Sequence, residues 1–248
     1  CRPDRVFAVS APSKAWLDEL HSFTWLVHLA CARQALHRVF ARGMLQAWWR
    51  RRRSTSVHAH SRRLISLSQH AGFLLEAAPA EFEQVFLGQL QREFHRLQRL
   101  RSKDQGTRLE QAIALLTASL VFRGLETSIA SSLARVGTLV DRMVLPDGGF
   151  AGRSPAALLQ FLLDVVPLRE VLTARRLAMP RELNAAIERA MVMLRLLTHG
   201  DQGLAVFQGV GDIAARPVET LFARDAVSGR PLSHASHSGY ARLHHCAS

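Results

Sequence analysis

The chain has 248 residues, of which 48% are hydrophobic, so it is long enough to bury the core of one large domain or two smaller ones. The sequence holds no uninterrupted apolar run of about 18 residues, which excludes a membrane-spanning helix of ordinary length. Lysine and arginine number 32 against 20 acidic residues, and the formal net charge of +12 favours a polyanionic partner such as nucleic acid, an anionic membrane or an acidic polysaccharide.

Cysteine usage points away from metal and disulfide chemistry. The three cysteines, Cys1, Cys31 and Cys246, form no Cys-x-x-C motif, and we expect no metal site, disulfide framework or bound cofactor. Cys31 lies in an apolar helical stretch, which predicts a buried, inert thiol. The adjacent His244 and His245 would hold a metal only with further ligands nearby. A first residue of Cys rather than Met indicates a fragment; a processed lipoprotein is the alternative.

Helical periodicity dominates the chain from Ser22 to Leu197. After an irregular lead within residues 1–20, apolar residues recur at helical spacing in seven successive segments. In the first of these, the predicted inward stripe is Phe23, Leu26, Leu29, Leu36, Val39 and Phe40. The other segments begin near His60, Pro79, Thr107, Thr127, Ser154 and Pro180. The short loops between them make consecutive helices antiparallel neighbours, which predicts an all-α fold of helix hairpins, stacked as a solenoid or curled into a toroid.

A basic run follows the first helical segment. Trp48 and Trp49 precede four consecutive arginines, Arg50 to Arg53. The run fits a nucleic-acid patch, and it equally fits a solvated helix end, where cations complement the helix dipole. The two tryptophans fit stacking on sugar rings, but adjacent helical residues point about 100° apart, so at least one is expected in the core.

The segment Leu145–Pro155 breaks the helical pattern most sharply. Pro146 ends one helix, the turn Asp147-Gly148-Gly149 follows, and Ser154 with Pro155 provides the N-cap and first position of the next helix. Phe150 and Arg153 project from this loop. Two interpretations stay open: an ordinary helix–helix connection, or part of a binding site.

Several segments together resemble the heparinase II/III family of bacterial polysaccharide lyases. The resemblance implies an incomplete α/α toroid over residues 1–200, followed over 201–248 by a linker and the truncated start of a β-sandwich. The segments that carry it are Phe23-Thr24-Trp25-Leu26, Arg62-Arg63-Leu64-Ile65-Ser66, Asp147-Gly148-Gly149-Phe150, Arg153-Ser154-Pro155, Met191 with Leu194-Arg195, the stretch from His199 to Gly209, and Ser238-Gly239-Tyr240-Ala241-Arg242-Leu243.

The resemblance also implies an activity, the β-elimination of uronic-acid polysaccharides. That reaction needs a proton carrier such as Tyr or His, beside a group that neutralises the uronate carboxylate. The family's Asn/His position is occupied here by Thr107-Arg108, and no tyrosine follows Gly148-Gly149; Tyr240 is the chain's one tyrosine. We therefore predict that this chain binds an acidic polysaccharide without turning it over.

The candidate site residues follow from the same resemblance. The candidate catalytic residues are Arg108, His199 and Tyr240, and the candidate substrate-binding residues are Asp147, Gly148, Gly149, Phe150 and Arg153. Each has a structural alternative. Arg108 caps its own helix, His199 and Asp201 cap the helix before them, and Arg153 is a surface arginine or bonds loop carbonyls.

The predicted function is thus binding of an acidic polysaccharide, with cleavage possible in a full-length form. The alternative is a non-catalytic helical scaffold or a nucleic-acid-binding protein that uses the arginine-rich surface. The resemblance implies a periplasmic or cell-envelope location. The sequence predicts neither the sugar nor the oligomeric state.

Overall fold

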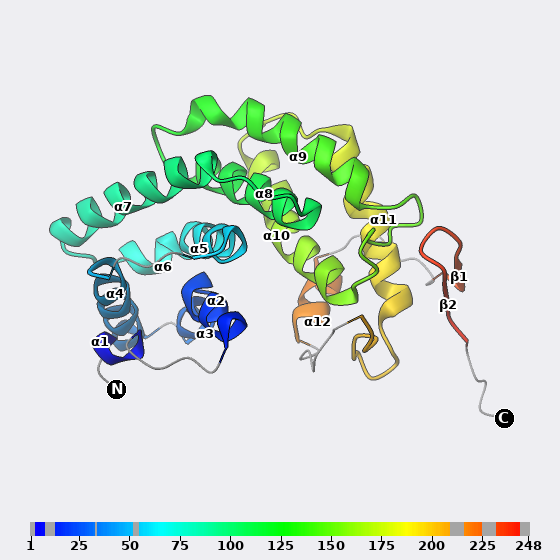
Figure 1. The fold of residues 1–248 in the computed structure, drawn as a ribbon, viewed down its shortest axis with the longest axis horizontal. Coiled ribbons are helices and arrows are strands. Elements are labelled where there is room, and N and C mark those ends of the chain that lie inside the picture. The colour runs from blue at the N-terminus through cyan, green and yellow to red at the C-terminus, as the bar shows by residue number, and fades with distance from the viewer. Residues whose placement is uncertain are drawn as a thin grey trace. The chain divides into compact units, whose positions relative to one another are not determined.

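The structure is a computed structural model, and it describes residues 3–7, 13–32, 34–51, 55–208, 216–224 and 232–243. These residues divide into two compact units, Cys1–Ser132 and Leu133–Ser248 (Figure 1). The described residues are mainly helical, which confirms the predicted all-α class. Arg52, Arg53, His244, His245, Cys1 and Cys246 lie outside the described residues.

The first unit consists of helices joined by short connections. In chain order they are α1 (Pro3–Val6), α2 (Lys14–Ser22), α3 (Leu26–Cys31), α4 (Ala35–Trp49), α5 (Val57–Gln69), α6 (Ala71–Leu75), α7 (Ala80–Arg99), α8 (Gln105–Val121) and the 3-10 turn η1 (Glu126–Ser128).

Helix α5 is the centre of the first unit. It packs against α2, α3, α6, α7 and α8, and every residue from Ala59 to Ser68 is buried. Two of its three serine hydroxyls are satisfied within the helix, because Ser61 donates to the carbonyl of Val57 and Ser68 donates to that of Leu64. A helix with so many polar residues can therefore occupy the middle of the core.

The first predicted helix is interrupted in the structure. Residues 23–25 form a turn between α2 and α3, with Phe23 in the left-handed region at φ 62° and fully buried. The Phe23 ring packs edge-on against the rings of Trp25 and Trp48, each 5.3 Å away between centroids. This packing holds a conformation that a non-glycine residue seldom adopts.

Because of this interruption, part of the predicted inward-facing stripe is wrong. Leu36 and Val39 on α4 are 73% and 61% exposed, because the breaks between α2, α3 and α4 change the direction that each helix presents to the core. Cys31 is likewise exposed rather than buried. It is the last residue of the six-residue helix α3, of which Leu26 is the buried member.

The second unit is built around α10, which packs against α11 and α12. The 15-residue α9 begins at the boundary between the units and continues into the second one. The elements are α9 (Ile129–Met143), α10 (Pro155–Ala174), α11 (Arg181–Leu197), α12 (Arg216–Ala223) and the antiparallel pair β1 (His234–Ala235) and β2 (Tyr240–Ala241). The strand β2 lies within the resembling segment Ser238–Leu243. The predicted domain boundary at residue 200 stays a prediction.

Two short hairpin-like turns follow α9 and α11. Val144 bridges to Phe150 across the Asp147-Gly148-Gly149 turn, and Thr198 bridges to Leu204 across the next one. Gly148 has φ 87°, and a Cβ atom there would lie 2.0 Å from the carbonyl oxygen of Arg189 on α11. The first turn therefore needs glycine both for its backbone conformation and for its contact with α11.

Within the described segments, no helix is both long enough and apolar enough to cross a membrane.

Candidate functional site

The carboxylate of Asp147 connects the loop after α9 to the C-terminal strand pair. Its Oδ2 accepts a hydrogen bond from the backbone N–H of Ser238 at 2.6 Å, and its Oδ1 accepts one from Ser238 Oγ, also at 2.6 Å. The N–H of Gly149 donates to Oδ1 at 3.1 Å. Burial raises the pKa of the Asp147 carboxyl, but these hydrogen bonds outweigh it and hold the pKa below its ordinary value.

Tyr240 makes a second connection to the same loop. Its hydroxyl donates to the backbone carbonyl of Arg153 at 2.7 Å. The pKa of the phenol is raised, first by burial, with the positive charge of Arg153 opposing and the negative charge of Asp147 adding to the rise. A phenol with a raised pKa, whose proton is engaged by a carbonyl, is a weak candidate for a proton-abstracting base.

The structure thus gathers most of the predicted site in one place. We call the residues Asp147, Gly149, Arg153, Ser238 and Tyr240 the loop clasp. Phe150 lies beside it but is buried, with its ring 5.6 Å from that of Phe161 on α10. A Cβ atom on Gly149 would lie 1.8 Å from Ser238 Oγ, so the second glycine also permits a close approach. Arg153 is exposed and has φ 51°.

The other two candidate catalytic residues lie elsewhere. His199 is an exposed turn residue whose backbone N–H donates to the carbonyl of Gly203, and Asp201 accepts from the N–H of Gly203. Arg108 belongs to the first unit, where its guanidinium lies 3.3 Å from the side-chain oxygen of Gln105. The catalytic roles of Arg108, His199 and Tyr240 stay predictions.

A buried ionic cluster lies within the core of the first unit, and sequence reasoning did not identify it. Arg63 on α5 is 1% exposed, and its Nη2 lies 2.7 Å from Oε2 of Glu93 on α7. His60 Nε2 lies 2.8 Å from the same carboxylate oxygen. The Arg63 guanidinium also covers the ring of Trp48 at 4.4 Å and donates to the carbonyl of His21 at 2.8 Å.

Two of the resembling segments contact each other beside the cluster. Arg63 and Ser66 come from the second segment, and Ser66 Oγ donates to the carbonyl of Phe23 in the first at 2.7 Å. These contacts hold α5 against the turn between α2 and α3. The sequence did carry one signal: Glu93 falls on the apolar stripe of α7, between Leu90 and Leu97, where a carboxylate requires a buried partner.

The charges of the cluster stabilise one another. Burial raises the pKa of the Glu93 carboxyl, but hydrogen bonding to His60 and the positive charge of Arg63 lower it to about 2. The pKa of Arg63 is lowered by burial, against the opposing effect of Glu93, and an arginine stays charged at neutral pH under such a shift. Because Arg63 and His60 are buried, the cluster holds the core together rather than forming an open site.

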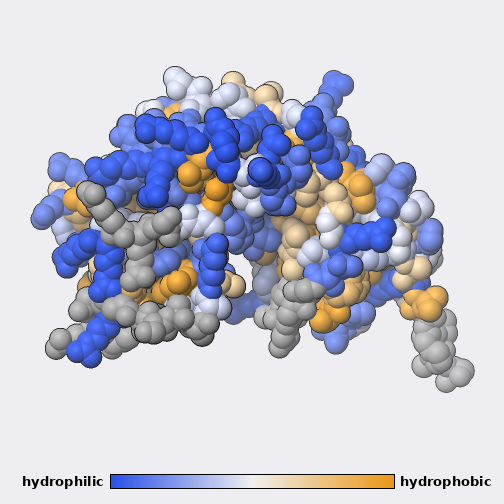
Figure 2. All heavy atoms as spheres, in the orientation of Figure 1, coloured by the Kyte–Doolittle hydropathy of each residue, from blue (hydrophilic) through white to orange (hydrophobic). Residues whose placement is uncertain are grey.

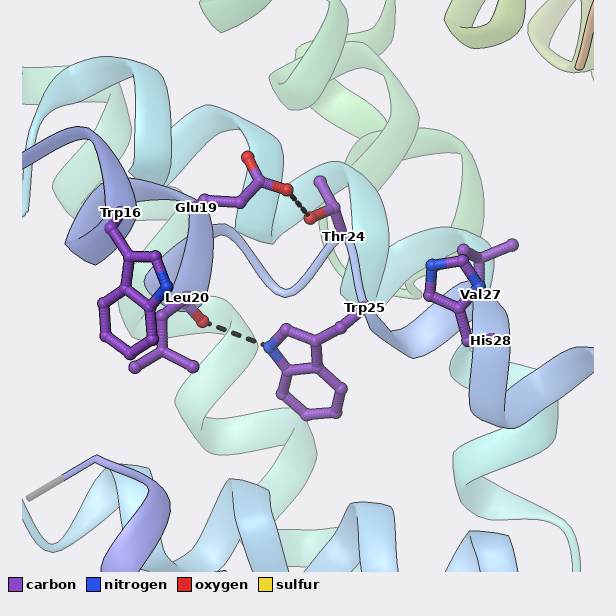
Figure 3. A pocket seen from close by; sticks show the side chains of 7 residues that line it. All are labelled: Trp16, Glu19, Leu20, Thr24, Trp25, Val27 and His28. Atoms are coloured by element: carbon purple, nitrogen blue, oxygen red, sulfur yellow. Dashed lines mark hydrogen bonds between the residues drawn. The ribbon is translucent and has the colours of Figure 1, made fainter. Parts of the chain in front are cut away.

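An open pocket of about 410 Å³ lies on the first unit, at the turn between α2 and α3 (Figure 3). Trp16 and Trp25 present their indole rings to it, with Leu20 between them, and Glu19 and Thr24 lie together at one side. The Thr24 hydroxyl donates to the Glu19 carboxylate, and the Trp25 indole N–H donates to the carbonyl of Leu20 at 3.1 Å. We call this the indole pocket; Val27 and His28 complete its lining.

A basic patch covers the end of α7 and the start of α8. We call it the α7–α8 patch; its members are Arg92, Arg96, Arg99, Arg101, Lys103 and Arg108. Figure 2 shows hydrophilic side chains along α7. The buried side chain of Gln111 donates to the carbonyls of Leu97 and Leu100, at 2.6 and 3.0 Å, and so fixes the connection between the helices. The acid within the patch, Asp104, is occupied as the N-cap of α8.

The two tryptophans that precede the arginine run, Trp48 and Trp49, pack against other aromatic side chains. Trp48 is buried and its indole N–H donates to Nδ1 of His21 at 3.0 Å. The ring of Trp49 lies 5.8 Å from that of Phe82. Among the residues that the structure describes, no three His, Cys, Asp or Glu side chains gather in a way that could hold a metal ion.

Comparison with known proteins gives a relative in sequence and a solved structure of similar fold. The chain is 31% identical over 251 residues to FtsZ-localized protein C of Caulobacter vibrioides, a match that covers 96% of this chain and 42% of that protein. The fold is similar to that of heparinase III, with a TM-score of 0.74 and 14% sequence identity over 88% of this chain and 38% of that one. No family model matches the sequence.

The two comparisons bear on different parts of the prediction. At 14% identity the structural likeness concerns the fold alone, and it agrees with the helical toroid that the resemblance implied. This chain spans about two-fifths of the length of each of the two proteins. The sequence relative lends no support to polysaccharide binding or cleavage.

Proposed function

We propose that this chain is a non-catalytic binding module that localises with FtsZ. The observation that supports the proposal is the 31% identity to FtsZ-localized protein C, which extends over 96% of this chain. A match of that extent includes both compact units rather than one shared motif. Because the chain spans 42% of its relative, the partners of the whole protein are part of the proposal.

The contacts of Tyr240, a predicted catalytic residue, and of Asp147, a predicted substrate-binding residue, support a binding role. Asp147 receives its donors from Ser238 and Gly149, and the Tyr240 hydroxyl is engaged by the Arg153 carbonyl. These contacts occupy two of the groups that a β-eliminating site in this loop would offer to a substrate. The toroid-like fold then serves as a scaffold, since one fold supports many unrelated functions.

The test is localisation together with direct binding. The chain, fused to a fluorescent protein and expressed in Caulobacter, should form the same pattern as labelled FtsZ and should disperse when FtsZ is depleted. Purified chain should sediment with FtsZ polymers assembled with GTP and stay in the supernatant without them. A uniform or periplasmic distribution, with no co-sedimentation, would refute the proposal. The periplasmic outcome would instead favour the location implied by the heparinase resemblance.

A second candidate function is binding of an acidic polysaccharide, and the α7–α8 patch favours it. Arg92, Arg96 and Arg99 lie at three- and four-residue steps on α7, Arg101 and Lys103 follow in the connection to α8, and the guanidinium group pairs well with carboxylate and sulfate oxygens. The loop residues Asp147 to Phe150 and Arg153 stay predicted substrate contacts under this candidate. Nucleic acid is a competing polyanion for the same patch.

A binding panel with charge-matched variants tests the second candidate. The double variant Arg96→Ala and Arg99→Ala should weaken binding of heparan sulfate, alginate or hyaluronan fragments by about tenfold at low salt. The control variant Arg175→Ala and Arg181→Ala removes the same charge from exposed positions of the second unit and should bind as the parent does. Equal losses in both variants would indicate nonspecific attraction, and tighter binding to DNA than to every glycan would favour nucleic acid.

A further inference from the structure

We propose that the indole pocket binds a cationic side chain, the arginine or lysine of a partner peptide. The indole pocket is a different site from the α7–α8 patch. Its proposed ligand is a cation, whereas the ligands proposed for the patch are anions. It rests on the chemistry of the pocket lining, which combines aromatic faces with one fixed carboxylate. A positive charge on an aliphatic stem is the group that such a lining recognises.

One of the two aromatic walls, Trp25, is fixed in orientation. The Trp25 indole N–H is engaged by the carbonyl of Leu20 at 3.1 Å, so the ring presents its face rather than its polar edge. Trp16 is 41% exposed, which leaves its ring accessible from solvent. The negative face of an indole attracts a cation more strongly than that of other aromatic rings.

The carboxylate is held at the same pocket. Glu19 accepts a hydrogen bond from the Thr24 hydroxyl through Oε1, which orients the carboxylate beside the indoles (Figure 3). With histidine counted as neutral, Glu19 is the one charged residue of the lining, whereas the chain as a whole carries +12. The lining thus carries one negative charge on a positive protein, which favours a cationic group there over an anionic one.

The size of the pocket suits a side chain. Its volume of about 410 Å³ lies in the range of small-ligand sites, roughly 300–1,000 Å³. Leu20 and Val27 supply aliphatic surface for the stem of an arginine or lysine. Of the resembling motif Phe23-Thr24-Trp25-Leu26, the middle two residues line the pocket, while Phe23 and Leu26 are buried in the core.

The experiment uses three tripeptides, acetyl-Gly-Arg-Gly-amide, its lysine analogue and its citrulline analogue, in NMR titrations of the chain. The arginine and lysine peptides should shift the indole N–H signals of Trp16 and Trp25 with a dissociation constant of about 1 mM. Citrulline keeps the shape of arginine without the charge, so its peptide should bind about tenfold more weakly or not at all.

Variants separate the pocket from general electrostatics. Glu19→Gln keeps an oxygen for the Thr24 hydrogen bond and should weaken the arginine peptide about tenfold, as should Trp16→Leu. Asp18→Asn removes the same charge one residue away, outside the lining, and should leave binding unchanged. Circular dichroism should confirm that each variant keeps its helical content.

Three outcomes would overturn the proposal. The first is equal binding of the arginine and citrulline peptides. The second is equal loss in Glu19→Gln and Asp18→Asn. The third is absence of any shift with the cationic peptides. Shifts of the same indole signals by N-acetylglucosamine oligomers, unaffected by Glu19→Gln, would identify the pocket as a carbohydrate site instead.

Discussion

Arg63 and Glu93, 30 residues apart in sequence, face each other inside the first unit with two contacts, Nε to Oε2 at 3.2 Å and Nη2 to Oε2 at 2.7 Å. The pair connects α5 to α7, and His60 adds a third group to the same carboxylate. Removing any one partner would leave a buried charge without full compensation, which is strongly destabilising.

Arg63→Met should destabilise the chain by about 3–5 kcal/mol, because the buried Glu93 carboxylate would lose its arginine partner and keep only His60. The measurement is urea unfolding followed by circular dichroism at pH 7. The double variant Arg63→Met with Glu93→Gln should lose less than the sum of the two single variants. Additive losses would show that the two side chains are not energetically coupled.

Acid should weaken the first unit through Glu93. Its pKa lies at about 2 in the folded chain against an ordinary value of 4.5, so its stabilising contribution is complete above pH 4.5 and is lost as the pH falls towards 2. The contribution is on the order of 3 kcal/mol. Unfolding free energies at pH 6 and pH 3 should differ less in Glu93→Gln than in the parent. Identical pH dependence in the two proteins would contradict this assignment.

Asp147→Ala should loosen the C-terminal strand pair without unfolding the helices, because it removes the acceptor of both Ser238 bonds. Hydrogen exchange of the Ser238 and Gly239 amides should speed up roughly 5- to 150-fold, the equivalent of about 1–3 kcal/mol. The control is Asp141→Ala, which removes an exposed carboxylate from α9. Protection that persists in Asp147→Ala would mean that other contacts hold the pair.

Gly148→Ala should cost about 2–4 kcal/mol, since the added methyl group meets the Arg189 carbonyl and φ 87° disfavours a side chain. Gly152→Ala in the same loop is the matched control; a Cβ atom there has no neighbour within 4 Å, so we expect a change within about 0.5 kcal/mol. Thermal unfolding measures both. Equal melting temperatures for the two variants would refute the predicted close contact.

The chain should not cleave uronic-acid polymers. The expected result is no growth in the ultraviolet absorbance of unsaturated uronate when purified chain is incubated with heparan sulfate, alginate or hyaluronan. The physical reason is the Tyr240 hydroxyl, whose proton is directed at the Arg153 carbonyl and whose pKa is raised. A signal proportional to protein, and abolished by Tyr240→Phe, would restore the catalytic prediction.

The sequence by itself determined the elements whose causes are local. Ser154 caps α10 by accepting from the N–H of Ala157 at 3.3 Å, and Asp104 caps α8 through Thr107, as their residue types lead one to expect. Helix α10 is apolar on nearly all sides and is buried in the second unit. Capping and periodicity act within a few residues, so they can be recognised without any tertiary contact.

The tertiary structure decided what depends on partners far along the chain. The turn at Phe23 is held by the rings of Trp48 from α4 and Trp25 from the turn itself, which pack against the Phe23 ring. No local sequence pattern predicted this break in the helix. Asp147 and Ser238 meet across 91 residues, and the resemblance placed both segments in one family pattern without showing that they bond. The cluster of Arg63 with Glu93 and the indole pocket likewise arise where helices meet. Long-range packing selects these pairs by the free energy of burial, which a linear sequence does not display.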